Sequence, residues 1–327
     1  MPQIELSEIC KAFTIRERPE GKFSILKGMV KRQKREIKAI QGISFAIEEG
    51  ELVGYIGPNG AGKSTTVKVM SGILTPESVS CSILGRTPWK ERTAHVSQIG
   101  VVFGQRSQLW WDVPVNDSFE LLRDIYGIGS RQYHARLGEL AQVLELGALL
   151  KTPVRQLSLG QRMRCEAAAA LLHSPKILFL DEPTIGLDAV SKLALREFLM
   201  QENRAHGVTM ILTTHDMDDV EALCSRVMTI GHGRLLFDGT LEQLRAHYAP
   251  LHRIRATLER EADYREIAGT QRGSLQGRQY TAWFDAAQLP AQTLVAALAE
   301  AYPLRDIVIE EDDIDHMIAT MYQEMKL

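Results

Sequence analysis

The chain has 327 residues, a net charge of −3, 24% charged residues and 45% hydrophobic residues. This length exceeds one average domain, so we expect a soluble globular protein with one large and one small domain. The slightly acidic balance argues against a general attraction to nucleic acid. The four cysteines lie far apart without a C-x-x-C pair, which argues against a zinc site or a disulfide framework and is typical of a reducing compartment.

The distribution of apolar residues argues against a secretion signal and against a membrane-spanning helix. Around Ile4 the chain alternates apolar and acidic residues, which predicts a strand and not the basic, then apolar, leader of a secreted protein. The longest apolar runs, such as Ala167 to Leu172, are far shorter than the roughly 20 residues needed to cross a bilayer. Any membrane role therefore requires a partner chain.

A glycine-rich loop lies between a predicted strand, Leu52 to Ile56, and an apolar-periodic stretch, Val67 to Ile73. Glycine allows successive backbone N–H groups to surround phosphate oxygens, and the helix that follows points its positive end at them. In such a loop the lysine reaches the terminal phosphates and the serine hydroxyl binds Mg²⁺. The segment therefore predicts a site for a nucleoside triphosphate and Mg²⁺, formed by Gly57, Pro58, Asn59, Gly60, Ala61, Gly62, Lys63, Ser64 and Thr65.

A second apolar run, Lys176 to Leu180, ends in two carboxylates and is then stopped by Pro183. The run reads as a strand buried on both faces. Asp181 is suited to hold Mg²⁺, and Glu182 is suited to polarise a water molecule. Both carboxylates are therefore predicted at the end of a core strand.

A helix is predicted to start at Leu157 to Gln161 and to continue to about His173, with Ser158 as its N-cap. A helix start with a nearby glycine is a second candidate anion site. Because the chain has one lysine-bearing loop, we expect this second site to receive the phosphate of a nucleotide bound to another copy.

With these motifs in this order, residues 1–245 resemble the nucleotide-binding subunits of ATP-binding cassette (ABC) transporters. The resemblance implies an α/β P-loop fold with a mixed sheet core and a helical subdomain. The family signature is normally Leu-Ser-Gly-Gly-Gln, and here Leu159 replaces its first glycine. By this resemblance Ser158, Gly160 and Gln161 contact the γ-phosphate of ATP across a dimer interface, and the substitution at Leu159 leaves that role intact.

The resemblance also implies catalytic roles. Asp181 matches the aspartate that organises Mg²⁺, and Glu182 matches the general base that orients the attacking water. His215 follows a predicted strand, Val208 to Thr213, and matches the histidine that contacts the γ-phosphate and the base.

Two further loops match by the same resemblance. Gln105 corresponds to the glutamine that links the metal and the water to the membrane partner, although Gln98 and Gln108 offer alternative alignments of this loop. Asp188 corresponds to the loop through which the two subunits communicate.

Phe13 stands where the family places an aromatic ring against adenine. An aromatic residue at the end of an amphipathic strand can also be a core residue, so both interpretations stay open. A basic insertion of about residues 16–38 follows it, with Lys27, Lys31, Arg32, Lys34, Arg35 and Lys38 in its second half. This insertion is interpreted either as a contact to anionic lipid headgroups or an acidic permease loop, or as a solvated helical face.

Beyond Gln105, Trp110 and Trp111 fall in a loop, Leu109 to Pro114, that the family uses to grip its permease. They are either exposed anchors for the membrane partner or core residues of the helical subdomain.

A small α+β domain is predicted for residues 250–327, after a helix from Leu241 to His247 and a boundary near Pro250. Three segments have strand patterns, and the last segment has apolar residues on one helical face. The strand candidates are 254–258, 280–284 and 304–309, and the helical residues are Ile314, Met317, Ile318, Met321 and Met325. The layout resembles the C-terminal domain of ABC exporter ATPases, which implies dimerisation or regulation.

The sequence therefore predicts an ATPase subunit, with ATP and Mg²⁺ as cofactors, that powers export as a dimer of identical copies through separately encoded ABC permeases. It is expected at the cytoplasmic face of the inner membrane as a peripheral protein, without nucleic acid. Within the exporters it most resembles drug, viologen and polysaccharide export ATPases. An importer ATPase shares every motif, and a soluble ABC protein acting on ribosomes or DNA is a further alternative, although the chain lacks a second cassette and a long coiled coil.

Overall fold

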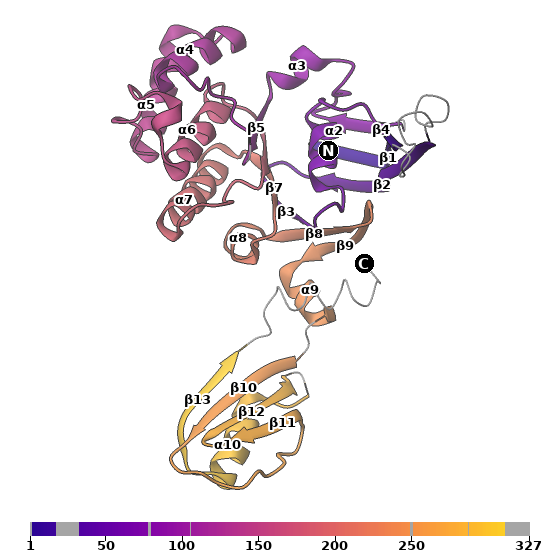
Figure 1. Ribbon diagram of the computed structural model, residues 1–327, viewed down its shortest axis with the longest axis vertical. Helices are drawn as coiled ribbons and strands as arrows, with labels where there is room; N and C mark the ends of the chain where they lie inside the picture. Colours follow the sequence, from indigo (N-terminus) through magenta and orange to yellow (C-terminus); the bar gives the residue numbers. More distant parts are fainter. Residues whose placement is uncertain are drawn as a thin grey trace, which may run out of the picture. The chain divides into compact units, whose positions relative to one another are not determined.

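A computed structural model of the chain describes residues 2–17, 33–77, 80–104, 106–248, 251–286 and 288–310. The chain divides into two compact units, Met1–Gly239 and Thr240–Leu327 (Figure 1). Several sequence predictions fall outside the described residues: Gln105, residues 18–32 of the basic insertion, Pro250 and the apolar stripe from Ile314 to Met325.

The first unit is built on a six-stranded sheet with the order β5-β6-β7-β3-β8-β9. Its inner strands are mostly apolar and almost wholly buried, which is the pattern of parallel strands covered on both faces. Neighbouring strands from β5 to β8 are parallel, so their carboxyl ends share one edge of the sheet. The strands are β3 (Leu52–Ile56), β5 (Ile99–Phe103), β6 (Ile177–Asp181), β7 (Thr209–Thr214), β8 (Arg226–Gly231) and β9 (Arg234–Thr240).

A second, antiparallel sheet has the order β2-β1-β4. Its strands are β1 (Ile4–Glu17), β2 (Gln33–Ile47) and β4 (Ser80–Ile83). Strand β4 pairs with β1 only as far as Ser7, so the outer halves of β1 and β2 continue as a two-stranded ribbon. Arg35 and Lys38 of the basic insertion lie on β2, so the prediction of a helical face is wrong for this part of it.

Helices flank the six-stranded sheet and are started by local sequence signals. Helix α6 (Leu159–Leu171) begins at Ser158, which forms a reciprocal capping box with Gln161, as an S-x-x-Q sequence favours. Helices α4, α5, α6 and α7 gather on one side of the unit in Figure 1. The helices of the unit are α2 (Lys63–Met70), α3 (Arg92–Val96), α4 (Val115–Tyr126), α5 (Ser130–Val143), η1 (Val154–Gln156), α6, α7 (Ala189–His206) and α8 (Met217–Leu223).

The apolar core of this unit joins the two sheets through α2. Buried side chains of β1, β2 and β4 meet those of β3 and α2 in a single cluster, which includes Ile43, Tyr55, Val67 and Ile83. Helix α2 ends at Met70, three residues before the end of the apolar-periodic stretch, because Gly72 adopts a left-handed φ of 74°. The core thus fixes the strand before the glycine-rich loop and the helix after it.

The described part of the second unit is built on an antiparallel sheet, and helix α10 packs against it. The order β11-β12-β10-β13 places β11 and β13 at the edges and β10, the first of these strands in the chain, inside the sheet. Leu294 and Leu298 of α10 pack on Ile254, Tyr280 and Phe284. The elements are α9 (Leu241–Tyr248), β10 (Leu251–Leu258), β11 (Thr270–Gln276), β12 (Gln279–Asp285), α10 (Ala291–Ala301) and β13 (Leu304–Glu310).

Candidate active site

The glycine-rich loop connects β3 to α2, as the sequence predicts, and two of its glycines, Gly57 and Gly62, are required by close packing. A Cβ atom at Gly57 would lie 2.4 Å from the carbonyl oxygen of Ile230. A Cβ atom at Gly62 would lie 2.6 Å from the carbonyl oxygen of Ala39, and Gly62 also has a φ of 113°. The loop therefore keeps its backbone amides close to neighbouring strands in a way that other residues would prevent.

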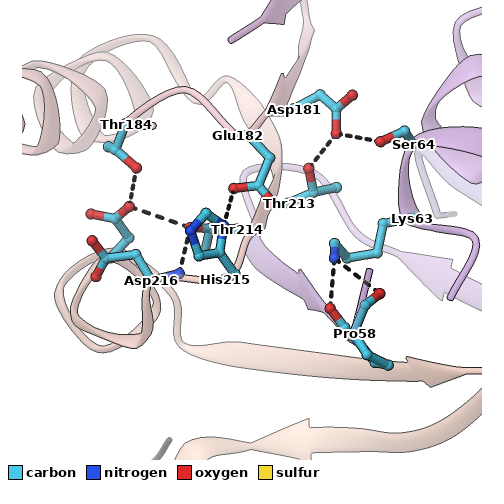
Figure 2. A network of polar contacts seen from close by, with 12 residues as sticks. Pro58, Lys63, Ser64, Asp181, Glu182, Thr184, Thr213, Thr214, His215 and Asp216 are labelled. Atoms are coloured by element: carbon cyan, nitrogen blue, oxygen red, sulfur yellow. Dashed lines mark hydrogen bonds and ion pairs between the residues drawn. The ribbon is translucent and has the colours of Figure 1, made fainter. Parts of the chain in front are cut away.

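Lys63 is the first residue of α2, and its ammonium turns back to its own loop. Nζ donates to the carbonyl oxygens of Gly57 at 2.6 Å and of Pro58 at 3.4 Å (Figure 2). Burial lowers the pKa of Lys63, while the nearby carboxylates of Glu182 and Asp181 oppose that shift. A cation held only by neutral carbonyl groups can exchange them for phosphate oxygens when a nucleotide enters.

Asp181 ends β6 and accepts two hydroxyl hydrogen bonds from other elements. Ser64 Oγ donates to its Oδ1 at 3.0 Å, and Thr213 Oγ1 donates to the same atom at 2.6 Å (Figure 2). A carboxylate and a serine hydroxyl are hard oxygen ligands, and Mg²⁺ typically binds one or two such groups and keeps several water molecules. Ser64 and Asp181 therefore fit the Mg²⁺ that such loops bind.

Glu182 follows directly and is paired with His215. The Nδ1 atom of His215 lies 2.7 Å from Oε2 of Glu182, whose side chain is 17% exposed, whereas the His215 side chain is 61% exposed. Glu182 has a φ of +54°, which is rare for a residue with a side chain and typical of functional turns. Gly104 allows this turn, because a Cβ atom there would lie 2.0 Å from the carbonyl oxygen of Glu182.

These groups line one cavity of about 530 Å³. It is large enough for a nucleotide-sized ligand. Its walls include seven residues of the predicted loop together with Asp181, Glu182 and His215, and the other lining residues are Ala39, Lys68, Ile73, Phe103, Gly104, Arg106 and Ile185. Gly104 and Arg106 flank Gln105, so that loop reaches the cavity, while the alternative glutamines Gln98 and Gln108 do not line it.

Phe13 lies on β1 opposite Ile37 and does not line this cavity. Its side chain is 38% exposed, and the ammonium of Lys11 lies 5.7 Å from the ring centroid. The core interpretation of Phe13 is therefore wrong, and its contact with adenine stays a prediction.

The signature segment forms a second cluster. Ser158 Oγ accepts from the amide of Gln161 at 3.2 Å, and a Cβ atom at Gly160 would lie 2.4 Å from Ser191 Oγ. Asp188 caps α7, accepting from the amide of Ser191 at 2.9 Å, and these hydrogen bonds lower the pKa of its carboxyl. Ser158, Gly160, Gln161 and Asp188 thus gather in one place, but none of them lines the cavity of Lys63.

Sequence reasoning missed the buried polar groups that hydrogen-bond to Asp181 and to the residues next to Glu182 and His215. Thr213 holds Asp181, and a buried carboxylate, Asp219, holds Thr184 and Thr214. The available signal was the pair Thr213 and Thr214 at the end of a buried strand, since buried hydroxyl groups need partners.

Both tryptophans of the predicted docking loop are exposed, Trp111 to 51%. The prediction of core residues is therefore wrong for Trp110 and Trp111. Among the described residues, every helix is too short or too polar to span a bilayer.

Comparison with known proteins places this site in a family. The model of the ABC transporter family matches residues 40–185. The chain is 32% identical over 212 residues to the ABC transporter ATP-binding protein NatA of Bacillus subtilis, which covers 65% of this chain and 86% of NatA. It is also 32% identical over 268 residues to the Nod factor export ATP-binding protein I of Burkholderia lata, over 81% and 83% of the two chains.

A solved structure gives the same result for the fold. The structure of cbiO1 from Clostridium perfringens, part of the ABC transporter complex cbiONQ, has a TM-score of 0.61 and 26% identity, and the match covers 75% of this chain and 91% of cbiO1. The sequence matches and the fold thus point to the same family. The chain belongs to the ABC transporter family of ATP-binding proteins and is an ABC-type ATPase.

Proposed function

We propose that this chain hydrolyses ATP as one half of a head-to-tail pair of identical copies and so powers export through separately encoded membrane permeases. One observation carries the proposal. The chain holds two groups of residues of the kind that bind ATP, and these groups do not share a cavity, since Ser158, Gly160 and Gln161 lie apart from the cavity of Lys63. A second copy supplies the missing half of each site.

In this arrangement the backbone amides of residues 57–65 and the ammonium of Lys63 bind the phosphates. Ser64 and Asp181 would hold Mg²⁺, with Gln105 as a further proposed ligand, and the ion would neutralise negative charge on the phosphates. Phe13 is proposed to contact the adenine.

Glu182 is the proposed general base. Its carboxylate accepts the proton of the attacking water as the water oxygen bonds to the γ-phosphorus and the bond to the ADP oxygen breaks. His215, within 2.7 Å of that carboxylate, orients it and donates toward the γ-phosphate. Binding of the γ-phosphate by Ser158 and Gly160 of the second copy makes the closed pair more stable with ATP than with ADP, and this difference drives the permeases.

Export is the direction that the relatives support. One relative is named for Nod factor export, and others from Bacillus subtilis and Streptomyces coeruleorubidus are named for linearmycin and daunorubicin resistance. We propose the same direction here, at the cytoplasmic face of the membrane, with Trp110 and Trp111 facing the permease. The C-terminal unit, from about residue 250, is proposed to act in dimerisation or regulation.

The test is the oligomeric state of Glu182→Gln, measured by size-exclusion chromatography with light scattering. Without its base the protein is expected to bind ATP but not to hydrolyse it, so it should run as a dimer with ATP and Mg²⁺ and as a monomer with ADP. Glu182→Gln combined with Lys63→Ala is the control and should stay monomeric. A Glu182→Gln protein that stays monomeric in saturating ATP contradicts the paired arrangement.

Direction is tested separately. The tagged Glu182→Gln protein is purified from membranes with ATP, and the proteins that accompany it are identified. Recovery of a polytopic membrane protein supports the transport role, and cargo flux in vesicles that contain it then distinguishes export from import. Recovery of ribosomal or DNA-bound material without a membrane protein contradicts transport.

A further inference from the structure

Asp219 is a fully buried carboxylate next to the candidate active site. It plays no part in the chemistry described above. It lies on α8 with 0% exposure. Its Oδ1 accepts from Arg196 Nε at 2.6 Å, and its Oδ2 accepts from Thr184 Oγ1 and, more weakly at 3.5 Å, from Thr214 Oγ1. A buried charge is retained only when it is paired and hydrogen-bonded. This carboxylate therefore joins α8 to α7, to the turn after β6 and to the end of β7.

Two of these partners are neighbours of catalytic residues. Thr184 lies two residues after Glu182, and Thr214 directly precedes His215. Both threonines are buried, and Figure 2 shows Thr184 to the left of Glu182 and Thr214 beside the ring of His215. One carboxylate therefore ties together the turn that carries the base and the loop that carries the histidine.

His215 depends on such support because its own side chain is mostly exposed. Its imidazole contacts Glu182, and little packing around it restricts its orientation. The backbone of its loop must therefore set where the ring lies, and that backbone is held through the residues on either side of it.

Helix α7 holds the other side of the same loop. Lys192 forms an ion pair with Asp216, and Arg196 Nη2 lies 3.7 Å from Asp216 Oδ1. The amide of Asp216 donates to Thr214 Oγ1 at 3.0 Å. Burial alone would raise the pKa of Asp216, but the hydrogen bond and charge of Lys192, together with the charge of Arg196, hold it below its ordinary value. The ion pair of Asp216 with Lys192 is thus favoured in its charged form.

We propose that Asp219, together with Arg196, is a positioning group for ATP hydrolysis that fixes Glu182 and His215 relative to one another. The inference rests on the proposed hydrolytic function and adds to it residues outside the nucleotide-binding motifs. Helix α7, which carries Arg196, starts at the Asp188 cap. The Asp219–Arg196 pair therefore also connects two loops: that of Asp188, proposed to lie at the interface between copies, and that of His215.

A purely stabilising role would leave the chemistry unchanged in a folded variant. Thr184→Val tests this, because it keeps the size of the side chain and the Asp219–Arg196 ion pair while removing one hydrogen bond. We expect its kcat to fall about 10- to 100-fold, the effect of misplacing catalytic groups. The KM for ATP should stay within about twofold, since substrate binding is not altered. Thr184→Ser, which restores the hydroxyl, should recover most of the rate.

Helix α7 offers a matched control for loss of a buried ion pair. Glu202 pairs with Arg136 of α5, and both side chains are buried. Glu202→Gln removes the pair with Arg136, and Arg196→Met removes the pair with Asp219 and the weaker contact with Asp216. Both variants are expected to have a lower thermal unfolding temperature. Only Arg196→Met should lower kcat in the folded protein. If Arg196→Met does not fold, Thr184→Val still decides the question.

The outcomes separate this inference from the proposed function. In a His215→Ala background, Thr184→Val should lower kcat little further, because both changes act through the Glu182–His215 pair. A Thr184→Val protein with wild-type kcat, or a Glu202→Gln protein as slow as Arg196→Met, overturns the positioning role alone. A wild-type chain that does not hydrolyse ATP contradicts the proposed function instead.

Discussion

Glu182 and His215 lie 33 residues apart in the sequence, yet His215 Nδ1 is 2.7 Å from Glu182 Oε2. They meet because β6 and β7 are parallel neighbours whose carboxyl ends reach the same edge of the sheet. Glu182 leaves β6 through a left-handed turn, and its amide donates to the carbonyl oxygen of Thr213 on β7 at 2.9 Å. The backbone thus joins the two turns before their side chains meet.

Replacement of His215 by alanine is expected to leave ATP binding intact and to lower kcat about 100-fold or more. The imidazole orients the carboxylate that takes the proton of water, and such acid–base groups contribute about 10²- to 10⁴-fold. Steady-state ATP hydrolysis and equilibrium nucleotide binding measure the two quantities. His134→Ala, on the exposed surface of α5, is the control and should hydrolyse ATP at the wild-type rate. Wild-type kcat in His215→Ala would exclude the role proposed for the imidazole.

The glycines of the phosphate-binding loop predict a graded effect on stability. Gly60→Ala introduces a Cβ atom into open space at a φ of 84°, so we expect only backbone strain, about 1–3 kcal/mol. Gly62→Ala has the same kind of strain and also brings a Cβ atom to 2.6 Å from Ala39 O. The free energy of unfolding, from denaturant titration, should therefore fall further in Gly62→Ala. Equal losses in the two variants would show that the contact with Ala39 relaxes without cost.

The large unit could be predicted from the sequence because its signals are local and agree with one another. An apolar run before Gly57, an apolar-periodic stretch after the glycine-rich loop and the capping residue Ser158 each indicate one element, and a strand or helix forms at each. Asp181, Glu182 and His215 could be expected near the glycine-rich loop because all of them end or follow strands, and parallel topology brings the ends of those strands together. Binding phosphate and Mg²⁺ requires particular residue types at particular spacings, and these can be read in the sequence.

Other features could not be predicted because tertiary structure decides them. Strand β11 (Thr270–Gln276) is mostly polar and contains Gly273, so it has no apolar alternation, and it forms because it pairs with β12 at the sheet edge. Asp219 resembles any other acidic residue of an exposed helix in the sequence. Its burial follows from the packing of α7 on α8, which a single sequence does not reveal.

Glu166 predicts a pH dependence of stability with a defined sign. It is buried on α6, where it accepts a hydrogen bond from Ser107 and one from the amide of Gln108 at 3.1 Å. Burial nevertheless raises the pKa of its carboxyl above the ordinary value of 4.5. The folded chain then binds a proton more tightly than the unfolded chain, so the free energy of unfolding falls as pH rises from 4.5 through the raised pKa.

The matching variant is Glu166→Gln, which is neutral at every pH and lacks this contribution. Its unfolding free energy should depend less on pH than that of the wild type over the same window, by denaturant titration at a series of pH values. An unchanged slope would mean that the hydrogen bonds of Ser107 and Gln108 fully offset the effect of burial.

Trp111 is predicted to act in assembly and not in folding. Its ring is exposed and contacts the guanidinium of Arg162, with Cζ 5.9 Å from the centroid, so Trp111→Ala should lower the unfolding free energy by only about 0.5–1 kcal/mol. ATP hydrolysis should be unchanged, because the ring lies outside the cavity. Recovery of membrane proteins with the tagged chain should fall at least about tenfold, since exposed tryptophans serve as anchors at interfaces. Val143→Ala, an exposed apolar residue on α5, is the control and should recover them fully. Undiminished recovery with Trp111→Ala would show that the permease binds elsewhere.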